Sequence, residues 1–562
     1  MIWHLRKPST SKFVKPLYFC SDKFVHYRVY KYHHKLCLPS NWNSFFNLQY
    51  MIMFLYIVVC VSIILSFISF GISWRRNRDL TFTKWPIIGM LPYVLQNLSN
   101  IHDYAVFVLK HHGGTLMFEG PWFTNMNFIL TADPMNVHHI ASKNFSNYGK
   151  GSNFSEIFDF FGGGIITIDN LHAWKQERSI LHSLFQREDL KIFLRKTIQK
   201  KLENDLIPFL DYSSEVGTEV DLQFAFRRFT FDIACSSFLG FDPHSLSNKI
   251  TKLSLSAYER ASVVIEEAMF RRHITPRCLW KLQEWLHIGP EKKFKEAKET
   301  FDKFLYECVS SKREEQNRCN STKEVDDTHR DLLRVLMEEG AQKGKIMNDK
   351  YLRDTAFTFV SAGSGTISAS LSWFFWLVST HPHVEAKILE EIKDKCINQD
   401  GTWIASSVEE FGKLVYLHGA ICEALRLYPT VPYDHKCAIK SDTLPSGHHV
   451  SPNTMILYSL YAMGRMEQIW GDDCMEFKPE RWISERGDII HVPSHKFIAF
   501  NTGPRSCLGK DITFTEMKMV AVPILWKFQM KVVDVHPITP RVSMVLTIEQ
   551  GLKVKVTKRY TW

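Results

Sequence analysis

Residues 500–509 are Phe-Asn-Thr-Gly-Pro-Arg-Ser-Cys-Leu-Gly. One cysteine, Cys507, lies here between two glycines and shortly after an arginine. The residues that follow show a helical pattern, so Cys507 should lie near a helix N-terminus, where backbone N–H groups and the helix dipole stabilise a thiolate. The cysteine is therefore a candidate metal ligand. A buried, inert cysteine in a glycine-containing turn is the alternative.

The neighbours of Cys507 complete the pattern. Gly503 and Gly509 permit close approach of the backbone, because glycine has no Cβ. The segment resembles the haem loop of the cytochrome P-450 family, which it matches at Phe500, Gly503, Arg505, Cys507 and Gly509. The resemblance implies that Cys507 is the axial thiolate ligand of a haem b iron, where it favours O–O cleavage. It also implies that Arg505 binds a haem propionate, that Phe500 shields the thiolate side and that Gly509 borders the cofactor.

Two further motifs precede this loop in the family's order. Glu423 and Arg426 are three residues apart and share a helix face, and their apolar neighbours indicate burial, where an unpaired charge is costly. Pairs of this spacing also occur on exposed surfaces. Residues 479–482, Pro-Glu-Arg-Trp, resemble the family's next motif. The resemblance implies a structural role for Glu423, Arg426 and Arg481 as a buried charged triad that locks the haem pocket.

A further pair lies nearer the N-terminus. Trp174 and Arg178 are four residues apart on an expected helix, so they share a face. In the family such a pair binds the haem propionates. The resemblance therefore adds Trp174 and Arg178 to the candidate cofactor-binding residues.

Residues 349–379 predict one long, largely apolar helix. Asn348 and Asp349 are start signals, and His381-Pro382 ends the pattern. About 30 residues rising ~1.5 Å each give ~45 Å, enough to cross a whole domain. Glycines in its middle cost about 1 kcal/mol each relative to alanine, and they permit a kink or a widened turn in which a hydroxyl bonds a freed carbonyl.

The middle of this helix departs from the family pattern at one position. Residues 361–368 are Ser-Ala-Gly-Ser-Gly-Thr-Ile-Ser, and Gly365 stands where the family has an acid before its threonine. The resemblance implies that the Thr366 hydroxyl helps to protonate oxygen and that the missing acid relays protons. Thr366, Ser364 and Gly365 are thus candidate catalytic positions. Either water compensates for the acid, or the substrate brings a hydroxyl or amine, which a phenol has and an alkane lacks.

Length and cysteine spacing limit the architecture. The 562 residues contain no internal repeat, and we expect one two-lobed domain over residues 96–562, mainly α with small β-sheets, as in the cytochrome P-450 fold. A hairpin is expected around residues 444–457, and the charged stretch 310–330 is expected to be a solvated loop. Twelve cysteines without a C-x-x-C pair argue against a disulfide framework or zinc ribbon and for a reducing compartment.

A membrane anchor is expected before this domain. The 23 residues 51–73 are continuously apolar, and as a helix they are long enough to span a bilayer. Residues 74–95 begin with a basic stop and continue into a segment that resembles the proline hinge of membrane-anchored family members. No small-residue cleavage site follows, which disfavours a cleaved signal peptide. We expect a single-pass protein of the endoplasmic reticulum membrane with a cytosolic catalytic domain.

The first 50 residues do not fit this topology. They hold eight lysines and arginines against one acid, and so carry seven of the chain's ten net positive charges. By the positive-inside rule this block would move the catalytic domain across the membrane. We therefore expect residues 1–50 to be an extension outside the working protein; an acid-poor targeting segment is the alternative. The small remaining charge gives no reason to expect a nucleic-acid partner.

Within the family, the sequence most resembles the plant fatty-acid and alkane hydroxylases, by residues 147–151, 229–232, 240–243 and 431–436. Some relatives of that branch instead couple phenols in alkaloid synthesis, removing two hydrogen atoms without inserting oxygen. Because the acid is missing, we expect oxidative phenol coupling, with C–C bond formation, of an aromatic alkaloid precursor. The alternatives are mid-chain or terminal hydroxylation of long-chain alkanes or fatty acids, and a non-catalytic haem sensor, against which Thr366 argues.

The resemblance also implies the partners. Electrons would come from NADPH-cytochrome P-450 reductase, and the substrate would be a hydrophobic small molecule. Lys496 and Lys510 could steer an acidic partner to the Cys507 side, or they are simply solvated. Four phenylalanines suit an aromatic ligand, although a place in the core or facing the membrane explains any one of them better: Phe154, Phe158, Phe160 and Phe161.

Overall fold

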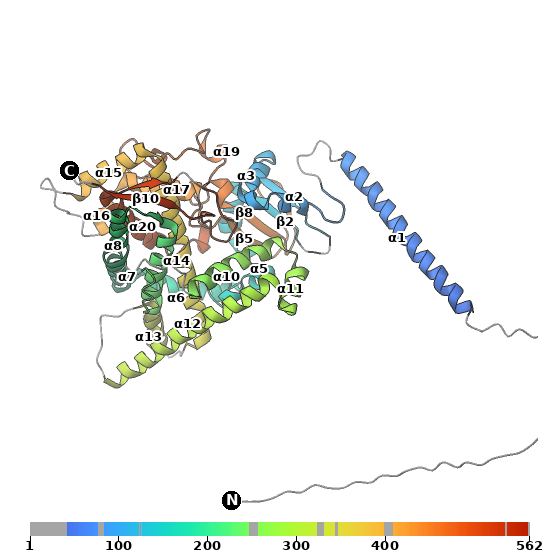
Figure 1. The fold of residues 1–562 in the computed structure, drawn as a ribbon, viewed down its shortest axis with the longest axis horizontal. Coiled ribbons are helices and arrows are strands. Elements are labelled where there is room, and N and C mark those ends of the chain that lie inside the picture. The colour runs from blue at the N-terminus through green and yellow to red at the C-terminus, as the bar shows by residue number, and fades with distance from the viewer. Residues whose placement is uncertain are drawn as a thin grey trace, which may run out of the picture. The chain divides into compact units, whose positions relative to one another are not determined.

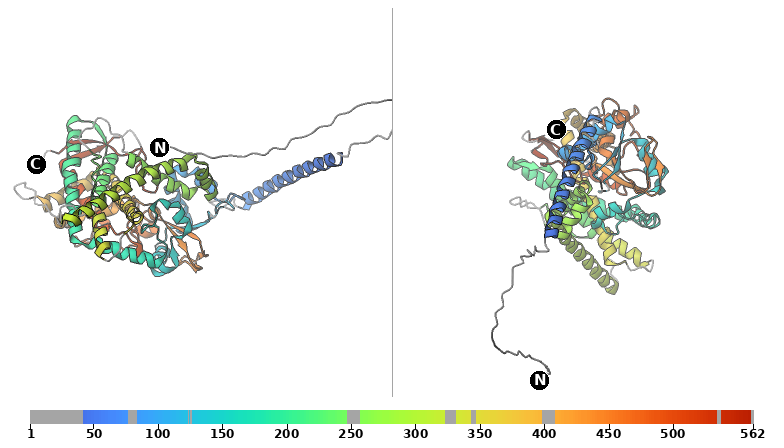
Figure 2. Two further views of the ribbon diagram at one scale, coloured as in Figure 1. Left: turned by 90° about the horizontal axis from the view of Figure 1, so that it is seen from below. Right: turned by 90° about the vertical axis from the view of Figure 1, so that its right-hand side faces the viewer.

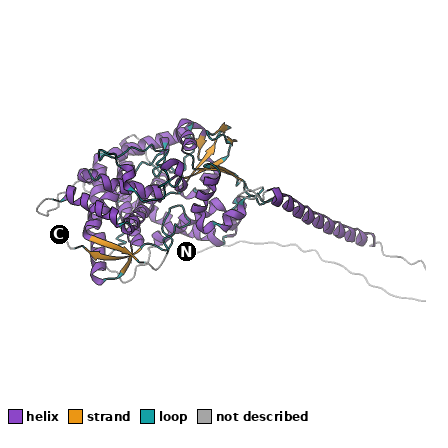
Figure 3. Ribbon diagram, turned by 90° about the horizontal axis from the view of Figure 1, so that it is seen from above, coloured by secondary structure: helices purple, strands orange, loops and turns teal. Residues whose placement is uncertain are grey.

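The protein is described by a computed structural model over residues 42–76, 84–122, 124, 126–246, 257–322, 331–342, 347–397, 408–533 and 537–559. The chain divides into two units, residues 1–69 and 70–562, shown in Figure 1. Helices make up most of the second unit, and its strands gather in two places (Figure 3). The predicted class, mainly α with small β-sheets, is confirmed.

One long apolar helix precedes the second unit. Helix α1 (Trp42–Arg76) contains an apolar stretch, Tyr50–Ile72, with a mean hydropathy of 2.9. Its length and composition allow it to cross a membrane, and its bounds differ by one residue at each end from the predicted 51–73. The helix itself starts earlier, inside the stretch assigned to the extension, while residues 1–41 lie outside the described residues.

Seven helices of the second unit carry the site or the core around it: α6 (Leu171–Gln186), α9 (Leu222–Ala234), α10 (Ala257–Ile274), α12 (Gly289–Thr322), α14 (Asp349–Thr380), α17 (Val415–Leu427) and α20 (Lys510–Lys527). The other α-helices are α2 (Leu91–Gln96), α3 (Ile101–His111), α4 (Pro134–His138), α5 (Gly151–Ile157), α7 (Glu188–Lys201), α8 (Ile207–Val216), α11 (Arg277–Leu286), α13 (Leu332–Gln342), α15 (Pro382–Cys396), α16 (Val408–Gly412), α18 (Leu460–Met463) and α19 (Glu467–Trp470).

The strands of the described residues form three small sheets. The largest has the order β1-β2-β8-β5-β3, in which β2 and β8 are parallel and the other pairs antiparallel. The others are β4-β10-β9 and β6-β7. Their bounds are β1 (Thr115–Phe118), β2 (Phe128–Thr131), β3 (Tyr148–Gly149), β4 (Glu219–Asp221), β5 (Tyr433–Ala438), β6 (Asp442–Thr443), β7 (His449–Val450), β8 (Met455–Ser459), β9 (Phe528–Val532) and β10 (Lys553–Lys558).

The predicted hairpin at 444–457 was wrong in its bounds. The hairpin is formed by β6 and β7, which pair Asp442 with Val450. Strand β8 instead lies between β2 and β5. Four of its five residues are buried, which suits an inner strand covered on both faces better than the second strand of an exposed hairpin.

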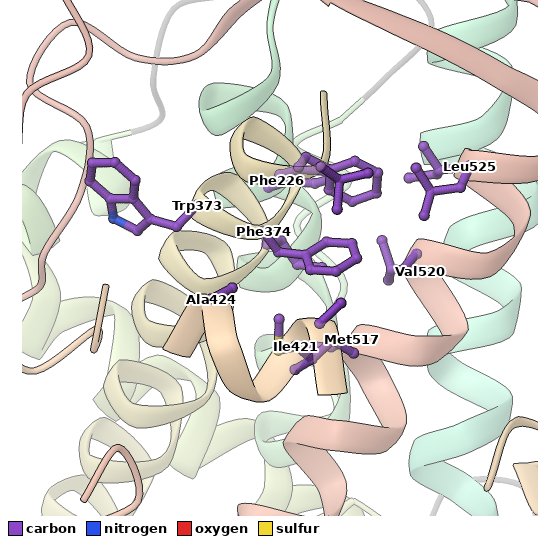
Figure 4. Packing of buried hydrophobic residues seen from close by; sticks show 14 of the residues in the cluster. Phe226, Trp373, Phe374, Ile421, Ala424, Met517, Val520 and Leu525 are labelled. Atoms are coloured by element: carbon purple, nitrogen blue, oxygen red, sulfur yellow. The ribbon is translucent and has the colours of Figure 1, made fainter. Parts of the chain in front are cut away.

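The prediction of one long helix is confirmed by α14. Its N-cap, Asn348, accepts a hydrogen bond through Oδ1 from Tyr351 N at 2.8 Å, and α15 starts directly afterwards at Pro382. Helix α14 packs with α9, α17 and α20 around the largest buried cluster. Figure 4 shows three of its side chains close together: Phe374, Ile421 and Met517.

The predicted loop at 310–330 was wrong over its first part, because α12 continues to Thr322. Charge pairing along the helix supports it: Lys312 contacts Glu315 one turn on and also reaches Asp331, both at 2.8–2.9 Å. Such pairs stabilise a helix whose composition is otherwise polar. Figure 2 shows this long helix, yellow-green, running across the second unit. Residues 323–330 lie outside the described residues.

Candidate active site

Cys507 lies in a loop that is closed by its own backbone. The Cys507 N–H donates to the carbonyl of Phe500 at 2.8 Å. The Phe500 ring packs on Phe514 of α20, with the ring centroids 5.1 Å apart. Helix α20 begins at Lys510, so the predicted place of Cys507 near a helix N-terminus is confirmed.

The two glycines of the loop meet different demands. Gly503 has a φ of 69°, a conformation that disfavours other residues, and a Cβ there would collide with the carbonyl of Ala141. Gly509 has a φ of −90° and needs no such freedom. Its Cα faces Cys507 instead, since a Cβ would lie 3.9 Å from the sulfur. A side chain at this position would therefore start in van der Waals contact with the thiol.

Several groups act on the Cys507 thiol. Burial raises its pKa, and so does the carboxylate of Asp511, whereas the Gly509 N–H, Arg178 and Lys510 lower it. Burial is the largest of these causes, so the protein alone does not hold a thiolate here. A bound metal ion would deprotonate the thiol outright. The site therefore has the chemistry of a metal ligand rather than of a free nucleophile.

Three predicted cofactor-binding residues come together beside this loop. The guanidinium carbon of Arg505 lies 4.6 Å from the centroid of the Trp174 ring, and Arg505 Nη2 donates to the Ile168 carbonyl at 2.9 Å. Arg505 Nε is buried and has no hydrogen-bond partner among the described residues. Arg178, one turn beyond Trp174 on α6, is close enough to interact with the Cys507 charge. Burial lowers the pKa of both arginines, which favours an anionic partner.

Glu423, Arg426 and Arg481 form one buried network. Arg426 donates to Glu423 from Nε and Nη2, each at 2.7 Å, and Arg481 Nε reaches Glu423 Oε1 at 3.2 Å. Trp482 Nε1 donates to the other oxygen at 2.9 Å. The remaining Arg426 donors bond the carbonyls of three residues that precede the 479–482 motif: Gly464, Cys474 and Glu476. The network therefore ties α17 to the chain leading toward the Cys507 loop.

A cavity of about 350 Å³ is lined mostly by apolar side chains. Helix α14 contributes Ser361, Ala362 and Thr366, and α10 contributes Glu266 and His273. Three of the four predicted phenylalanines also line it: Phe154, Phe158 and Phe161. The fourth, Phe160, is fully buried and packs against Phe357 and the Arg353 guanidinium.

The middle of α14 separates the candidate catalytic residues. The helix continues through both glycines without interruption, so the permitted widened turn is not formed. The Thr366 hydroxyl donates to the Ala362 carbonyl at 2.6 Å and borders the cavity. The Ser364 hydroxyl donates to Val360 at 2.6 Å, and its residue is buried against α9 rather than lining the cavity.

Sequence reasoning missed two titratable groups of the cavity and one buried ion pair. Glu266 and His273 belong to α10, for which the motifs gave no signal. Asp434 accepts from Lys150 Nζ at 2.9 Å and lies 3.5 Å from Lys436 Nζ. These residues had been used only as marks of family likeness. Lys150 and Asp434 are far apart in the sequence, so no motif spacing predicts that they pair. Only the fold brings these two opposite charges together.

The family model for cytochrome P450 matches residues 81–556, which include the cavity, the buried network and Cys507. The chain belongs to the cytochrome P450 family. The predicted family is thereby confirmed. Membership makes this protein a haem-thiolate, monooxygenase-type oxidoreductase that works with a redox-partner reductase on a hydrophobic substrate, and α1 is a candidate membrane anchor.

Several plant proteins are similar to this cytochrome P450 over most of their length. Alkane hydroxylase MAH1 of Arabidopsis thaliana is 39% identical over 515 residues, covering 91% of this chain and 99% of that protein. Noroxomaritidine synthase of Narcissus aff. pseudonarcissus MK-2014 is 37% identical over 513 residues, covering 90% and 96%. Cytochrome P450 86B1 of Arabidopsis thaliana is 36% identical over 496 residues, covering 86% and 87%.

The residues of this cytochrome P450 fit a thiolate-ligated haem. A haem carries two carboxylates, and Arg505 with its unpartnered Nε and Arg178 are two half-buried cations beside Cys507. Cys507 is exposed by surface area, although protein atoms surround the thiol closely enough for burial to raise its pKa, whereas Cys422 and Cys474 near this core are buried. Donor set and charge thus agree with the cofactor that the family implies.

Proposed function

We propose that this cytochrome P450 couples the phenol groups of an aromatic alkaloid precursor in plant specialised metabolism. It would do so by forming a C–C bond, with haem b as cofactor and NADPH-cytochrome P450 reductase as the electron donor. The similarity to noroxomaritidine synthase supports this function. The missing acid no longer supports it, because a carboxylate from another helix lies beside Gly365.

The proposal is carried by the position of His273, which presents a hydrogen-bond acceptor to the cavity. It lines the cavity, and its Nδ1 pairs with the Met269 carbonyl at 2.8 Å. Burial lowers the pKa of His273 to about 4, so the ring is neutral at physiological pH. With its proton on Nδ1, Nε2 is an acceptor, and it has no partner among the described residues. A phenol O–H can donate to this atom, whereas an alkane would leave it unsatisfied, which is costly in an apolar cavity.

The chemistry balances without an inserted oxygen atom. The bound haem supplies dioxygen activation, which the thiolate favours. Two hydrogen atoms leave the two phenol groups as the C–C bond forms. Two electrons from NADPH, together with two protons, complete the reduction of dioxygen to two waters. The phenol rings would stack among the cavity phenylalanines Phe154 and Phe158, whose own rings lie 4.1 Å apart.

Within this function each site residue has a proposed role. Cys507 would be the axial ligand, with Phe500 and Gly509 bordering it. Trp174, Arg178 and Arg505 would hold the propionates. The network of Glu423, Arg426 and Arg481 would keep the loop in place, and Thr366 would pass protons into the cavity.

Location and partner follow from the exposed parts. Residues 51–73 would anchor the protein in the endoplasmic reticulum membrane, with residues 74–95 as a hinge and residues 96–562 as a cytosolic catalytic domain. Residues 1–50 would lie outside the working protein. Lys496 and Lys510 are exposed in the part of the chain around Cys507, and they would attract an acidic face of the reductase.

Hydroxylation of long-chain alkanes or fatty acids is the second candidate. The similarity to alkane hydroxylase MAH1 favours it, and so does the mostly apolar cavity lining. The two functions differ in one atom of the product, because hydroxylation inserts oxygen and coupling does not.

Binding spectra and isotope labelling separate the two. Phenolic amines, long-chain alkanes and fatty acids would be screened for a shift of the haem Soret band. The His273→Leu variant should bind phenols about 10-fold more weakly, the value of one lost hydrogen bond, and alkanes equally well. The exposed His182 provides the control, His182→Leu. Turnover under ¹⁸O₂ should give a product two hydrogens lighter and free of label; a labelled hydroxyl would overturn phenol coupling.

A further inference from the structure

A carboxylate lies against the turn of α14 where the family's acid is missing. A Cβ built at Gly365 would lie 3.3 Å from Oε1 of Glu266, which belongs to α10. Among the described residues, and apart from α14 itself, the other atom within 4 Å is from Val545, at 3.9 Å. The Glu266 carboxylate therefore reaches the backbone of α14 because Gly365 has no side chain. An acid contributed by another helix lies beside the position at which α14 lacks one.

Glu266 also faces the cavity that Thr366 borders. Its Oε1 accepts from the Ser262 hydroxyl at 3.3 Å and lies 3.7 Å from Arg227 Nη2. Its second oxygen, Oε2, has no hydrogen-bond partner among the described residues. The side chain is 13% exposed, although it belongs to a helix packed into the unit. Glu266 thus has one oxygen fixed and one available to the cavity.

The surrounding charges oppose one another. Burial raises the pKa of Glu266 and is the largest cause; Arg227 of α9 and Arg541, which precedes β10, lower it, and Glu267 raises it. On α14 the facing residues are Gly365 and Thr366, which carry no charge. Because some neighbours favour the neutral carboxyl and others favour the carboxylate, Glu266 suits the role of a group that gives and regains a proton.

We propose that Glu266 takes the place of the acid absent at Gly365 and supplies protons to the Thr366 hydroxyl during dioxygen reduction. The O–H bond of the neutral carboxyl breaks as a proton reaches Thr366 Oγ1, directly or through one water. Thr366 releases its own hydroxyl proton into the cavity, and in doing so leaves the Ala362 carbonyl. The carboxylate regains a proton from solvent past Ser262 and Arg227. Dioxygen and electrons come from the family's own reaction, so the proposal holds for a phenol or an alkane substrate.

The geometry also predicts that two carboxylates, one at position 365 and one at position 266, would be unfavourable together. An aspartate at 365 would bring a second carboxylate against Glu266, where two like charges cannot both ionise cheaply. Gly365→Asp should therefore not improve this protein unless Glu266 is neutralised. This reverses the simple expectation that restoring the family's acid restores proton delivery.

Four variants of the full-length, haem-containing protein test the proposal: Glu266→Gln, Gly365→Asp, the double variant, and Glu267→Gln as a matched control. Glu267 is the next residue on α10 and pairs with Arg541 outside the cavity lining. The probes are tyramine, 4-ethylphenol, which lacks the amine, and dodecanoic acid. The readouts are probe affinity from the Soret shift, hydrogen peroxide released per NADPH from pH 5.5 to 9, and the thermal midpoint.

Glu266→Gln should leave the affinities for all three probes unchanged. It should raise peroxide release several-fold and flatten its pH dependence. Glu267→Gln should keep peroxide release low and only displace the pH profile toward lower pH, because Glu267 raises the pKa of Glu266. Gly365→Asp should lower the thermal midpoint in the parent protein more than in the Glu266→Gln background. The double variant should recover low peroxide release, because it returns a single acid to the same place.

Two outcomes would overturn the relay. One is unchanged peroxide release and an unchanged pH profile in Glu266→Gln. The other is a selective loss of affinity for tyramine, but not for 4-ethylphenol, with proton delivery intact; Glu266 would then bind the substrate ammonium. Neither outcome depends on whether the natural product carries an added oxygen. The proton relay can therefore be disproved while the proposed phenol coupling stands, and phenol coupling can be disproved while the relay stands.

Discussion

The cysteine side and the cavity side of this cytochrome P450 are built in different ways. The cysteine side is residues 500–509 and the start of α20, which are continuous in sequence and closed by backbone hydrogen bonds. The cavity side takes polar groups from α10, α14 and β5, and α10 and α14 alone are separated in sequence by three further helices. On the first side each residue constrains its neighbour, whereas on the second each side chain is placed by packing.

The difference indicates which properties each side controls. A loop whose backbone is fixed by a positive φ at Gly503 and by contact with Ala141 leaves little room for variation, so it decides the class of chemistry. A cavity whose groups come from separate helices can change one side chain at a time. The choice between a phenol and an alkane is therefore expected to depend on cavity residues such as His273, and the supply of protons on Glu266, but neither on Cys507.

Replacing the ligand gives the largest expected effect. Cys507→Ala should abolish the thiolate spectrum of the carbon-monoxide complex and all turnover, because the part of the loop that the structure describes holds no second thiol. Difference spectra of the reduced protein measure this, with Cys437→Ala, a half-buried cysteine of β5, as the control. A retained thiolate spectrum would contradict the assignment of Cys507 as the iron ligand.

The buried network should come next. Glu423→Ala leaves two arginines without their shared carboxylate, and breaking such a pair costs roughly 3–5 kcal/mol. We expect a lower unfolding midpoint and loss of bound haem, followed by thermal denaturation and Soret absorbance. Lys387→Ala breaks the exposed Lys387–Glu480 pair and should cost about 1 kcal/mol or less. Equal effects of the two would contradict a supporting role for the network.

Glu516 of α20 should make the stability of the cysteine side fall as the pH rises from 4.5 to about 8. Burial raises the pKa of Glu516 from 4.5 to about 8, so the folded state prefers the neutral form. Stability is then complete below pH 4.5 and falls by about 1.4 kcal/mol per pH unit as the pH rises toward 8. Glu516→Gln should remove this slope, measured as the thermal midpoint from pH 5 to 9. Glu390→Gln, an exposed change on α15, should leave the slope as it is.

The smallest effect is expected on the cavity side. Thr366→Ala should keep the fold and the thiolate spectrum but lower product per NADPH by roughly 10-fold, less than the ~10²-fold of a complete general acid. Thr366→Ser retains the hydroxyl and should stay close to the parent protein. Hydrogen peroxide and product are measured together. An unchanged yield of product per NADPH in Thr366→Ala would contradict a role for the Thr366 hydroxyl in proton delivery.

The parts predicted well from the sequence were those governed by local rules. The ends of α14 followed from a capping Asn348 and from Pro382, and the place of Cys507 followed from the helix after it. The loop predicted over 310–330 failed because charge composition does not show whether ion pairs will run along a helix. The spacing that marked Ser364 as a catalytic candidate did not show that the residue would be buried against α9.

The sequence by itself determined the haem-thiolate class, the long helix α14 and the apolar helix that could span a membrane, because each depends on residues close together in the chain. Only the tertiary structure decided which side chain lies beside Gly365 and which polar residues line the cavity. Glu266 meets α14, and His273 borders the cavity, through the packing of whole helices. That packing is the sum of many weak contacts over the entire core, so no short motif can encode it.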